Sequence, residues 1–164
     1  MAVFALTSCY VEVGTAWTGT APGGTSTPSG TLNSGTDISA MVTQVEMSFE
    51  SDELETTGFA AGGWRQKITG LATGSLSLTI NQDFAAAAGD ALFGLGGTVG
   101  FNPGQSTPYY IDIRPTSAAR GSTNPSYVAA WLNKSYQPVN GSVGELAVIT
   151  LTMPMTGRPA RLTS

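Results

Sequence analysis

The chain has 164 residues, a formal net charge of −4 and no histidine. This length is typical of a single domain that buries a sizeable core without disulfides. The lack of histidine excludes Ser-His-Asp and Cys-His catalysis and nearly every catalytic zinc site.

Charge is sparse and unevenly distributed. Charged residues make up 11% of the sequence, against about 25% in typical globular proteins. Residues 1–64 contain seven acidic residues and no lysine or arginine, whereas residues 65–164 contain seven basic and four acidic residues. This separation favours contacts between copies of the chain and argues against nucleic-acid binding, which requires a basic surface. The alternative is a Thr-rich β-protein that works alone.

The N-terminal region predicts a first strand over residues 3–13, because two alternating sets of side chains point to opposite faces. Cys9 is the only cysteine, so we expect a packed thiol and no intrachain disulfide. No signal-peptide pattern and no run of 18 apolar residues occurs. We therefore expect synthesis and retention in a cytoplasm.

Two segments have the composition of loops. Residues 14–36 are rich in Gly, Thr, Pro and Ser. This composition predicts a long loop that is either flexible or ordered by a partner. Residues 52–64 predict an acidic loop or hairpin tip.

Strong alternation surrounds the acidic loop. Residues 38–49 predict a second strand, with Val45 and Met47 on one face and Glu46 on the other. Residues 65–81 predict an extended third segment, bent near two glycines, Gly70 and Gly74. Each strand has one apolar face, and both faces are expected to pack on the same core.

The remaining chain predicts one helix and three strands. The helix is expected over residues 83–93, because apolar side chains recur there at helical spacing, namely Phe84, Ala87, Ala88, Ala91, Leu92 and Leu95. Strands are expected at residues 109–114, 127–137 and 145–153. The fold class is thus mainly β, a sandwich or barrel with one flanking helix, in a single domain spanning residues 1–164.

No catalytic, cofactor-binding or metal site is predicted. Glu46 and Glu50 would lie roughly 13 Å apart between Cα atoms at about 3.3 Å per residue, too far for a glycosidase pair unless the side chains converge. The acidic run at residues 50–55 lacks the pattern of a calcium loop. We therefore expect a chain that is not an enzyme and needs no cofactor.

Several segments together resemble the major tail tube proteins of long-tailed bacteriophages with non-contractile tails. The resemblance spans about residues 38–162. It rests on Val45–Ser48, Glu53–Phe59, Trp64–Arg65, Ile68–Leu71, Ser75–Leu78, Asp83, Gly144–Leu146, Thr156–Pro159 and Arg161. Residues 14–36 depart from the compact start of that family.

The resemblance implies hexameric rings that stack into a hollow tube, the conduit for DNA ejection into the host. It implies that Glu46 and Glu50 face the lumen, where an acidic lining would keep DNA moving without specific binding. It also implies contacts within or between rings, for which the candidates are Asp52, Glu53, Glu55, Arg65, Lys67, Arg158 and Arg161.

The partners implied are further copies of the chain, together with tape-measure, tail terminator and baseplate proteins. The location implied is the tail of the virion, assembled in the host cytoplasm, with no membrane contact. Two alternatives stay open. One is another structural protein of similar fold, such as a capsid decoration protein or a type VI secretion tube. The other is a carbohydrate-binding or hydrolytic β-domain.

Overall fold

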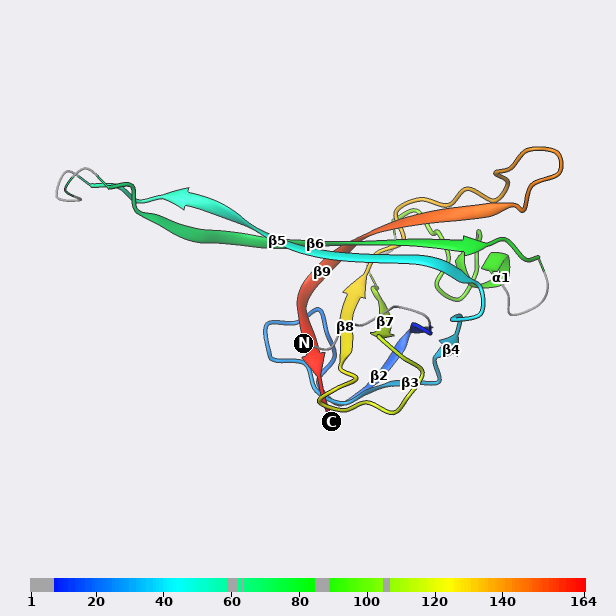
Figure 1. The fold of residues 1–164 in the computed structure, drawn as a ribbon, viewed down its shortest axis with the longest axis horizontal. Helices are drawn as coiled ribbons and strands as arrows, with labels where there is room; N and C mark the ends of the chain where they lie inside the picture. The colour runs from blue at the N-terminus through cyan, green and yellow to red at the C-terminus, as the bar shows by residue number, and fades with distance from the viewer. Residues whose placement is uncertain (1–7, 59–61, 63, 85–88, 105–106) are drawn as a thin grey trace.

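A computed structural model gives the structure of residues 8–58, 62, 64–84, 89–104 and 107–164 (Figure 1). The strands are β1 Tyr10–Gly14, β2 Ala16–Thr18, β3 Thr31–Asn33, β4 Thr36–Asp37, β5 Val42–Glu55, β6 Lys67–Asn81, β7 Tyr109–Arg114, β8 Ser126–Trp131 and β9 Val148–Leu162, and the helix is α1 Gly89–Phe93. The prediction of a mainly β fold with a flanking helix is confirmed.

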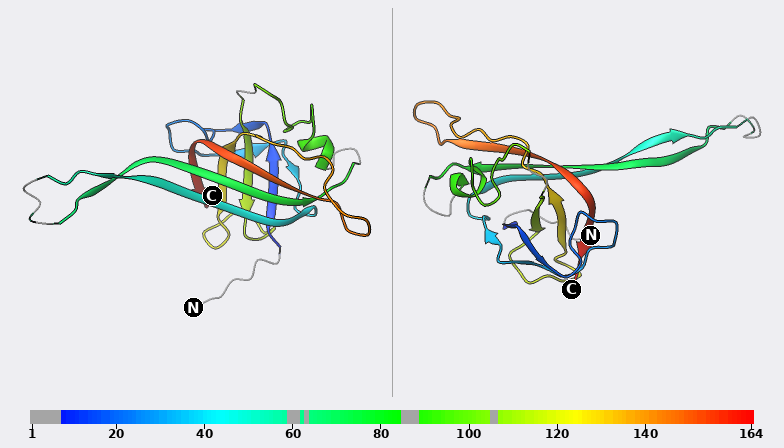
Figure 2. Two further views of the ribbon diagram at one scale, coloured as in Figure 1. Left: turned by 90° about the horizontal axis from the view of Figure 1, so that it is seen from above. Right: turned by 180° about the vertical axis from the view of Figure 1, so that it is seen from behind.

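Seven strands form one antiparallel sheet, in the order β4-β1-β7-β8-β9-β6-β5, and β2 pairs with β3 in a small second sheet. The large sheet folds over on itself. Figures 1 and 2 show β5, β6 and the first half of β9 crossing over β1, β7 and β8. The two layers enclose the core between them, and we call this two-layered part of the molecule the body.

The core comes from the alternation of apolar residues along each strand. Every second residue of β6 is fully buried at Leu76, Leu78 and Ile80, and β9 continues this pattern with Ile149 and Leu151. The facing strands contribute a second set of buried side chains, namely Val11, Val13, Ile111, Ile113, Ala129 and Trp131. The alternate residues of β6 and β9 therefore point to the opposite, outer face.

Strand β9 joins the two layers by bending. Its first part pairs with β6 and its last part with β8, with an irregularity between Val128 and Ala130 of β8. Gly157 lies at the bend with a φ of 73°. A side chain there would meet the backbone of Gly23, which is within 2.1 Å of the position of an added Cβ.

The first third of the chain is more ordered than predicted. Residues 14–36 were expected to be one long loop, but they contain β2 and β3 and the start of β4. The indole of Trp17 donates to the carbonyl of Ser29 at 2.9 Å, and its ring packs against Tyr110 of β7. These contacts give a polar, glycine-rich segment a fixed place on the body.

Strand β5 extends farther along the chain than predicted, whereas β6 nearly matches the expected segment. The expected strand 38–49 begins at Val42 and continues to Glu55, so residues 52–55 of the expected loop 52–64 are strand, and β6 begins at Lys67 instead of residue 65. Ile38 is buried outside any strand, with its N–H bonded to the carbonyl of Val11 at 2.9 Å. The two strands leave the body together as a long hairpin (Figure 1).

The boundaries of the other strands also differ from the prediction in most cases. Strand β1 begins at Tyr10, and residues 3–7 of the expected first strand lie outside the described residues. The strand 109–114 is confirmed, whereas β8 covers Ser126–Trp131 instead of 127–137 and β9 covers Val148–Leu162 instead of 145–153.

The helix is shorter than predicted where the structure describes it. Residues 83 and 84 are not helical, and residues 85–88 with two of the stripe alanines, Ala87 and Ala88, lie outside the described part. Phe84 and Leu95 are 65% and 78% exposed, so the predicted apolar stripe is wrong at both ends. Leu92 is buried beside Phe93 and anchors the helix. No helix of the described residues is long and apolar enough to cross a membrane.

Candidate functional site

The outer face of β5, β6 and β9 is a polar surface built from cross-strand rows. Strand pairing aligns Gln44 with Thr79 and Thr150, Glu46 with Ser77 and Thr152, Ser48 with Ser75 and Pro154, and Glu50 with Thr73. We call these residues the polar face. Its hydroxyls bond one another, at 2.9 Å between Ser48 and Ser75 and 3.4 Å between Thr79 and Thr150.

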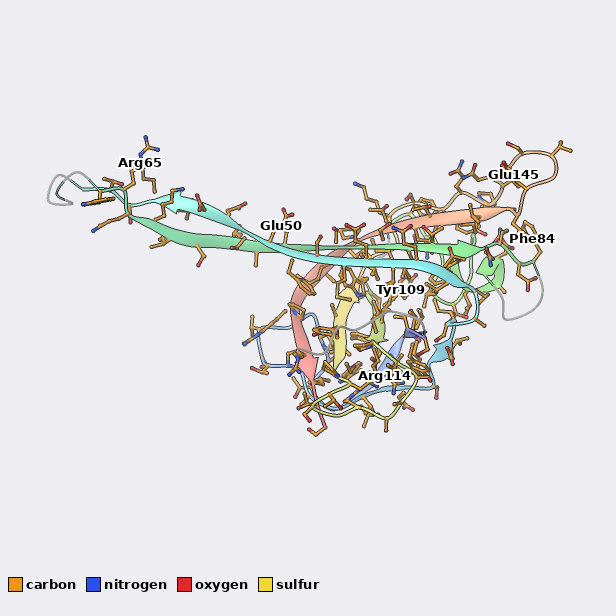
Figure 3. The ribbon with its side chains drawn as sticks, viewed as in Figure 1. Glu50, Arg65, Phe84, Tyr109, Arg114 and Glu145 are labelled. Carbon is orange, nitrogen blue, oxygen red and sulfur yellow. The ribbon has the colours of Figure 1, made fainter. Side chains whose placement is uncertain are left out.

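The polar face carries negative charge only. Among its residues, Glu46 and Glu50 are charged and exposed, and no lysine or arginine belongs to these rows. Figure 3 shows Glu50 projecting from the hairpin on the side away from the body. The structure thus places the two glutamates that the sequence suggested on one face, which is otherwise made almost wholly of hydroxyls and one amide.

Strand β5 lies at the edge of the large sheet. In the described part of the chain it pairs on one side only, with β6. An exposed edge of this length leaves a row of backbone N–H and C=O groups ready to pair with another strand. Sequence reasoning missed this edge, because the order of strands in a sheet is set by tertiary contacts.

An apolar hollow opens beneath the same strand. Val45, Met47 and Phe49 of β5 lie above Ile113 and Tyr127, and the hollow between them has a volume of about 350 Å³. Phe49 is 47% exposed at its rim. An incompletely covered apolar surface beside an unpaired edge is typical of a contact with another subunit.

The part of the hairpin beyond Glu50 projects from the body, and we call residues 51–72 the arm. It holds five of the predicted contact residues, namely Asp52, Glu53, Glu55, Arg65 and Lys67, all exposed. Lys67 and Glu53 form an ion pair across the two strands. An exposed pair of this kind contributes about 0–1 kcal/mol, so the arm has little charge-based stability of its own.

The two remaining predicted contact residues lie on the last part of β9. Arg158 is exposed, and its backbone exchanges hydrogen bonds of 3.4 Å with the carbonyl of Gly24 and the N–H of Gly23. Arg161 donates to the carbonyl of Ser122 at 3.3 Å. The arm extends away from the body (Figures 1 and 2), so these arginines do not meet the acidic residues of the arm within one chain.

The sequence did not predict a buried charged cluster around Asp112 of β7. Asp112 is 3% exposed and accepts hydrogen bonds from Ser126 at 2.5 Å and from Arg120 at 3.2 Å. Arg120 also donates to the carbonyls of Gly30 and Ser164, at 2.9 and 3.2 Å. This arginine therefore joins β7, the turn before β3 and the end of the described chain.

Three carboxyl-bearing residues lie side by side across β4, β1 and β7, and one of them is Asp112 of this cluster. Strand pairing places Glu12 opposite both Asp37 and Asp112. Burial raises the pKa of Glu12, and the charges of Asp112 and Asp37 raise it further, against the lowering effects of Tyr10 and Arg114. The guanidinium of Arg114 stacks over Tyr10 at 3.8 Å from the ring centre. In the sequence, Asp112 and Arg114 are two positions apart in a strand, which indicates that they share one face. Only the pairing of β1 with β7 shows that Glu12 lies on the same face.

The acidic and cysteine side chains of the described residues are the remaining candidates for chemistry. No group of three or more acidic or cysteine side chains among them could hold a metal ion. Cys9 is half-buried, and burial raises the pKa of its thiol, which disfavours the reactive thiolate. The surfaces described above are suited to contact between proteins.

The chain matches no protein-family model, and no curated protein sequence matches it. Solved structures do show the fold. A chain of the cap that terminates the tube of the anti-feeding prophage has a TM-score of 0.62 at 14% identity, covering 100% of this chain and 93% of that chain.

Two structures of gene transfer agent particles are also similar. A chain of the native virion has a TM-score of 0.55 at 17% identity, covering 77% of this chain and 88% of that chain. A chain of the tail of the empty particle, determined with C6 symmetry, has a TM-score of 0.54 at 16% identity, covering 79% of this chain and 87% of that chain. At these identities the likeness shows a shared fold.

Proposed function

We propose that this chain is a structural subunit of a phage-type tail, and that six copies form each ring of a hollow tail tube. The observation that carries the proposal is the polar face with its two glutamates, which lies on the same sheet as the unpaired edge of β5. The fold shared with chains of tail and tube particles supports it, as does the C6 symmetry of one of those tails.

In this proposal the edge of β5 pairs with a neighbouring copy, and the ring closes around the polar face. Pairing would satisfy the backbone groups of the edge and cover the hollow lined by Met47 and Phe49. Closed rotational symmetry leaves no β5 edge exposed within a ring.

The lumen works by repulsion. Glu46 and Glu50 repeated in every copy give a wall that phosphates do not bind, because binding to DNA depends on cations that displace its counterions. The hydroxyls between the glutamates keep the wall hydrated without adding positive charge. DNA can therefore pass during ejection into the host without being retained.

The same proposal covers partners and location. The chain acts in the virion tail, where tape-measure, tail terminator and baseplate proteins contact the tube, and the tail is of the long, non-contractile type. It is not an enzyme and uses no cofactor. Immunogold labelling of intact particles tests this, since label along a sheathless tail is expected and label on the capsid would contradict it.

A second candidate function is termination of a tube. It is favoured by the likeness to the anti-feeding prophage cap, which extends over the whole chain. The two candidates differ in polymerisation, because a terminating subunit forms one ring and does not stack.

Electron microscopy of the purified protein tests both candidates. Hollow tubes of stacked sixfold rings are expected for a tube subunit, and single rings for a terminating subunit. Native mass spectrometry supplies the copy number of the ring. A protein that stays monomeric at high concentration by both measurements would contradict the proposed function.

A further inference from the structure

Two exposed apolar patches lie at opposite ends of the molecule. The first, on the arm, consists of Leu54, Trp64 and Ile68, which are 51%, 81% and 54% exposed. Leu54 and Ile68 are cross-strand partners, and the backbone bond from Thr56 to the carbonyl of Gln66 keeps the two strands joined beyond them. We call this the arm patch.

The second patch consists of Phe84, Val139 and Leu146, which are 65%, 77% and 77% exposed. Gln82 ties its three segments together. The N–H of Gln82 donates to the carbonyl of Ala147, and its side chain donates to the carbonyl of Pro138, both at 2.9 Å. Each patch residue is therefore within two positions of one of these bonded residues. We call this the distal patch.

The margin of the arm patch carries both signs of charge, since Glu53 and Glu55 flank Leu54, whereas the margin of the distal patch is acidic. Arg65 follows Trp64 in the arm patch, and Glu145 precedes Leu146 in the distal patch, and both charged residues are exposed. Figure 3 shows Arg65 at the far end of the arm, with Phe84 and Glu145 at the opposite end of the long axis. The patches of one molecule are thus too far apart to meet each other.

We propose that the arm patch of one copy docks on the distal patch of the next copy, with Arg65 against Glu145. This contact rests on the proposed function and adds to it the surface by which copies are joined end to end. A second copy is the occupant, because the chain itself carries both halves of the contact, an exposed apolar patch at each end of its long axis, with the cation Arg65 at one end and the carboxylate Glu145 at the other.

The proposed contact uses two different surfaces, so it repeats from copy to copy instead of closing as a two-fold dimer. Contacts of this kind generate rings or open stacks, and both are compatible with a tube. Burial of the large side chains provides the attraction, and the charge pair selects the correct partner surface. The arm is then ordered in the assembly by the copy that it reaches.

Disulfide trapping tests the contact directly. In a Cys9→Ser background, the pair Arg65→Cys with Glu145→Cys should give a ladder of covalent dimers, trimers and larger oligomers on mild oxidation. The matched control combines Arg65→Cys with Ser117→Cys, since Ser117 is exposed in a loop outside both patches. The control should give no ladder.

The outcomes separate this contact from the proposed function. Tubes without a ladder would overturn the contact and leave the tube function standing. A ladder without rings or tubes would support the contact and contradict the function. Neither ladder nor assembly would contradict both.

Charge exchange provides a second measurement. Arg65→Glu or Glu145→Arg alone should raise the protein concentration needed for assembly at least roughly tenfold, because like charges would face each other across the contact. The double variant should return to within roughly threefold of the wild type. Equal assembly by all four proteins would overturn the proposal, and circular dichroism of the monomers controls for folding.

Discussion

Glu46 of β5 lies directly opposite Ser77 of β6, in a row that ends at Thr152 of β9. Such rows decide what the outer face presents, because directly opposed residues share one side of a sheet. A carboxylate beside two hydroxyls gives a hydrated, negative strip. Its sign can be reversed without disturbing the core, since the core residues alternate with these positions.

Reversal of that sign should make assembled tubes retain DNA. Glu46→Lys combined with Glu50→Lys adds cations to every copy, and retention of short duplex DNA should rise at least roughly tenfold at low salt and fall steeply as salt increases. Co-sedimentation of DNA with tubes measures it. Ser117→Lys, which adds a cation in a loop away from the polar face, serves as the control. Equal retention by the two variants would argue against a lumen lined by these glutamates.

Truncation of a leucine should have very different effects at the two ends of β6, one on the arm and one over the core. Leu78 is 0% exposed and Leu71 is 80% exposed. Leu78→Ala should lower the free energy of unfolding by about 2–5 kcal/mol, because it leaves a cavity in the core. Leu71→Ala should change it by less than about 0.5 kcal/mol. Urea denaturation of the monomer distinguishes them, and similar losses for both would mean that the core is wrongly placed.

Where alternation was strong and bounded by turn residues, the sequence predicted the structure closely. The strand Tyr109–Arg114 has the predicted limits, since it lies between Pro108 and Pro115. Glu46 and Glu50 were correctly placed on one face, since that follows from the period of a strand alone.

The arm and the helix show where such reasoning stops. Acidic residues at 52–55 and nearby glycines indicated a loop, yet pairing with residues 67–69 keeps this segment extended. In the helix, apolar spacing suggested a start at Asp83, but the carbonyl of Asp83 accepts a hydrogen bond from the N–H of Asp90 at 3.1 Å, outside the helical pattern. The arm is extended because its residues pair with a strand more than ten residues away in the sequence. The bond between Asp90 and Asp83 likewise lies outside the spacing of an α-helix.

A methyl group at Gly157 should be costly. This glycine has a φ of 73°, and an added Cβ would lie 2.1 Å from the carbonyl oxygen of Gly23. Gly157→Ala should therefore lower the free energy of unfolding by roughly 2 kcal/mol or more, from backbone strain and the clash together. Gly104→Ala is the matched control, since φ is 81° there and nothing lies within 4 Å. It should cost about 1 kcal/mol. Thermal unfolding compares them, and equal losses would show that the close approach does not exist.

Neutralising Glu12 should change how stability depends on pH. Its pKa is raised from the ordinary value of 4.5, chiefly by burial. A carboxyl whose pKa is higher in the folded state favours folding fully below its unfolded pKa, and this contribution is lost as the pH rises through the folded pKa. At neutral pH the wild type therefore holds a partly desolvated charge beside Asp112 and Asp37.

Glu12→Gln removes that charge and keeps the shape of the side chain. The difference in unfolding free energy between variant and wild type should shift in favour of the variant as the pH rises from below 4.5 to neutrality, because only the wild type loses stability from this group over that range. Urea denaturation at a series of pH values measures the difference. Glu55→Gln, on the exposed arm, is the control for a general effect of removing one negative charge. Two results would contradict the prediction: a difference in unfolding free energy for Glu12→Gln that does not vary with pH, or one that varies as it does for Glu55→Gln. Either result would mean that the row of carboxyl groups across β4, β1 and β7 does not destabilise the fold.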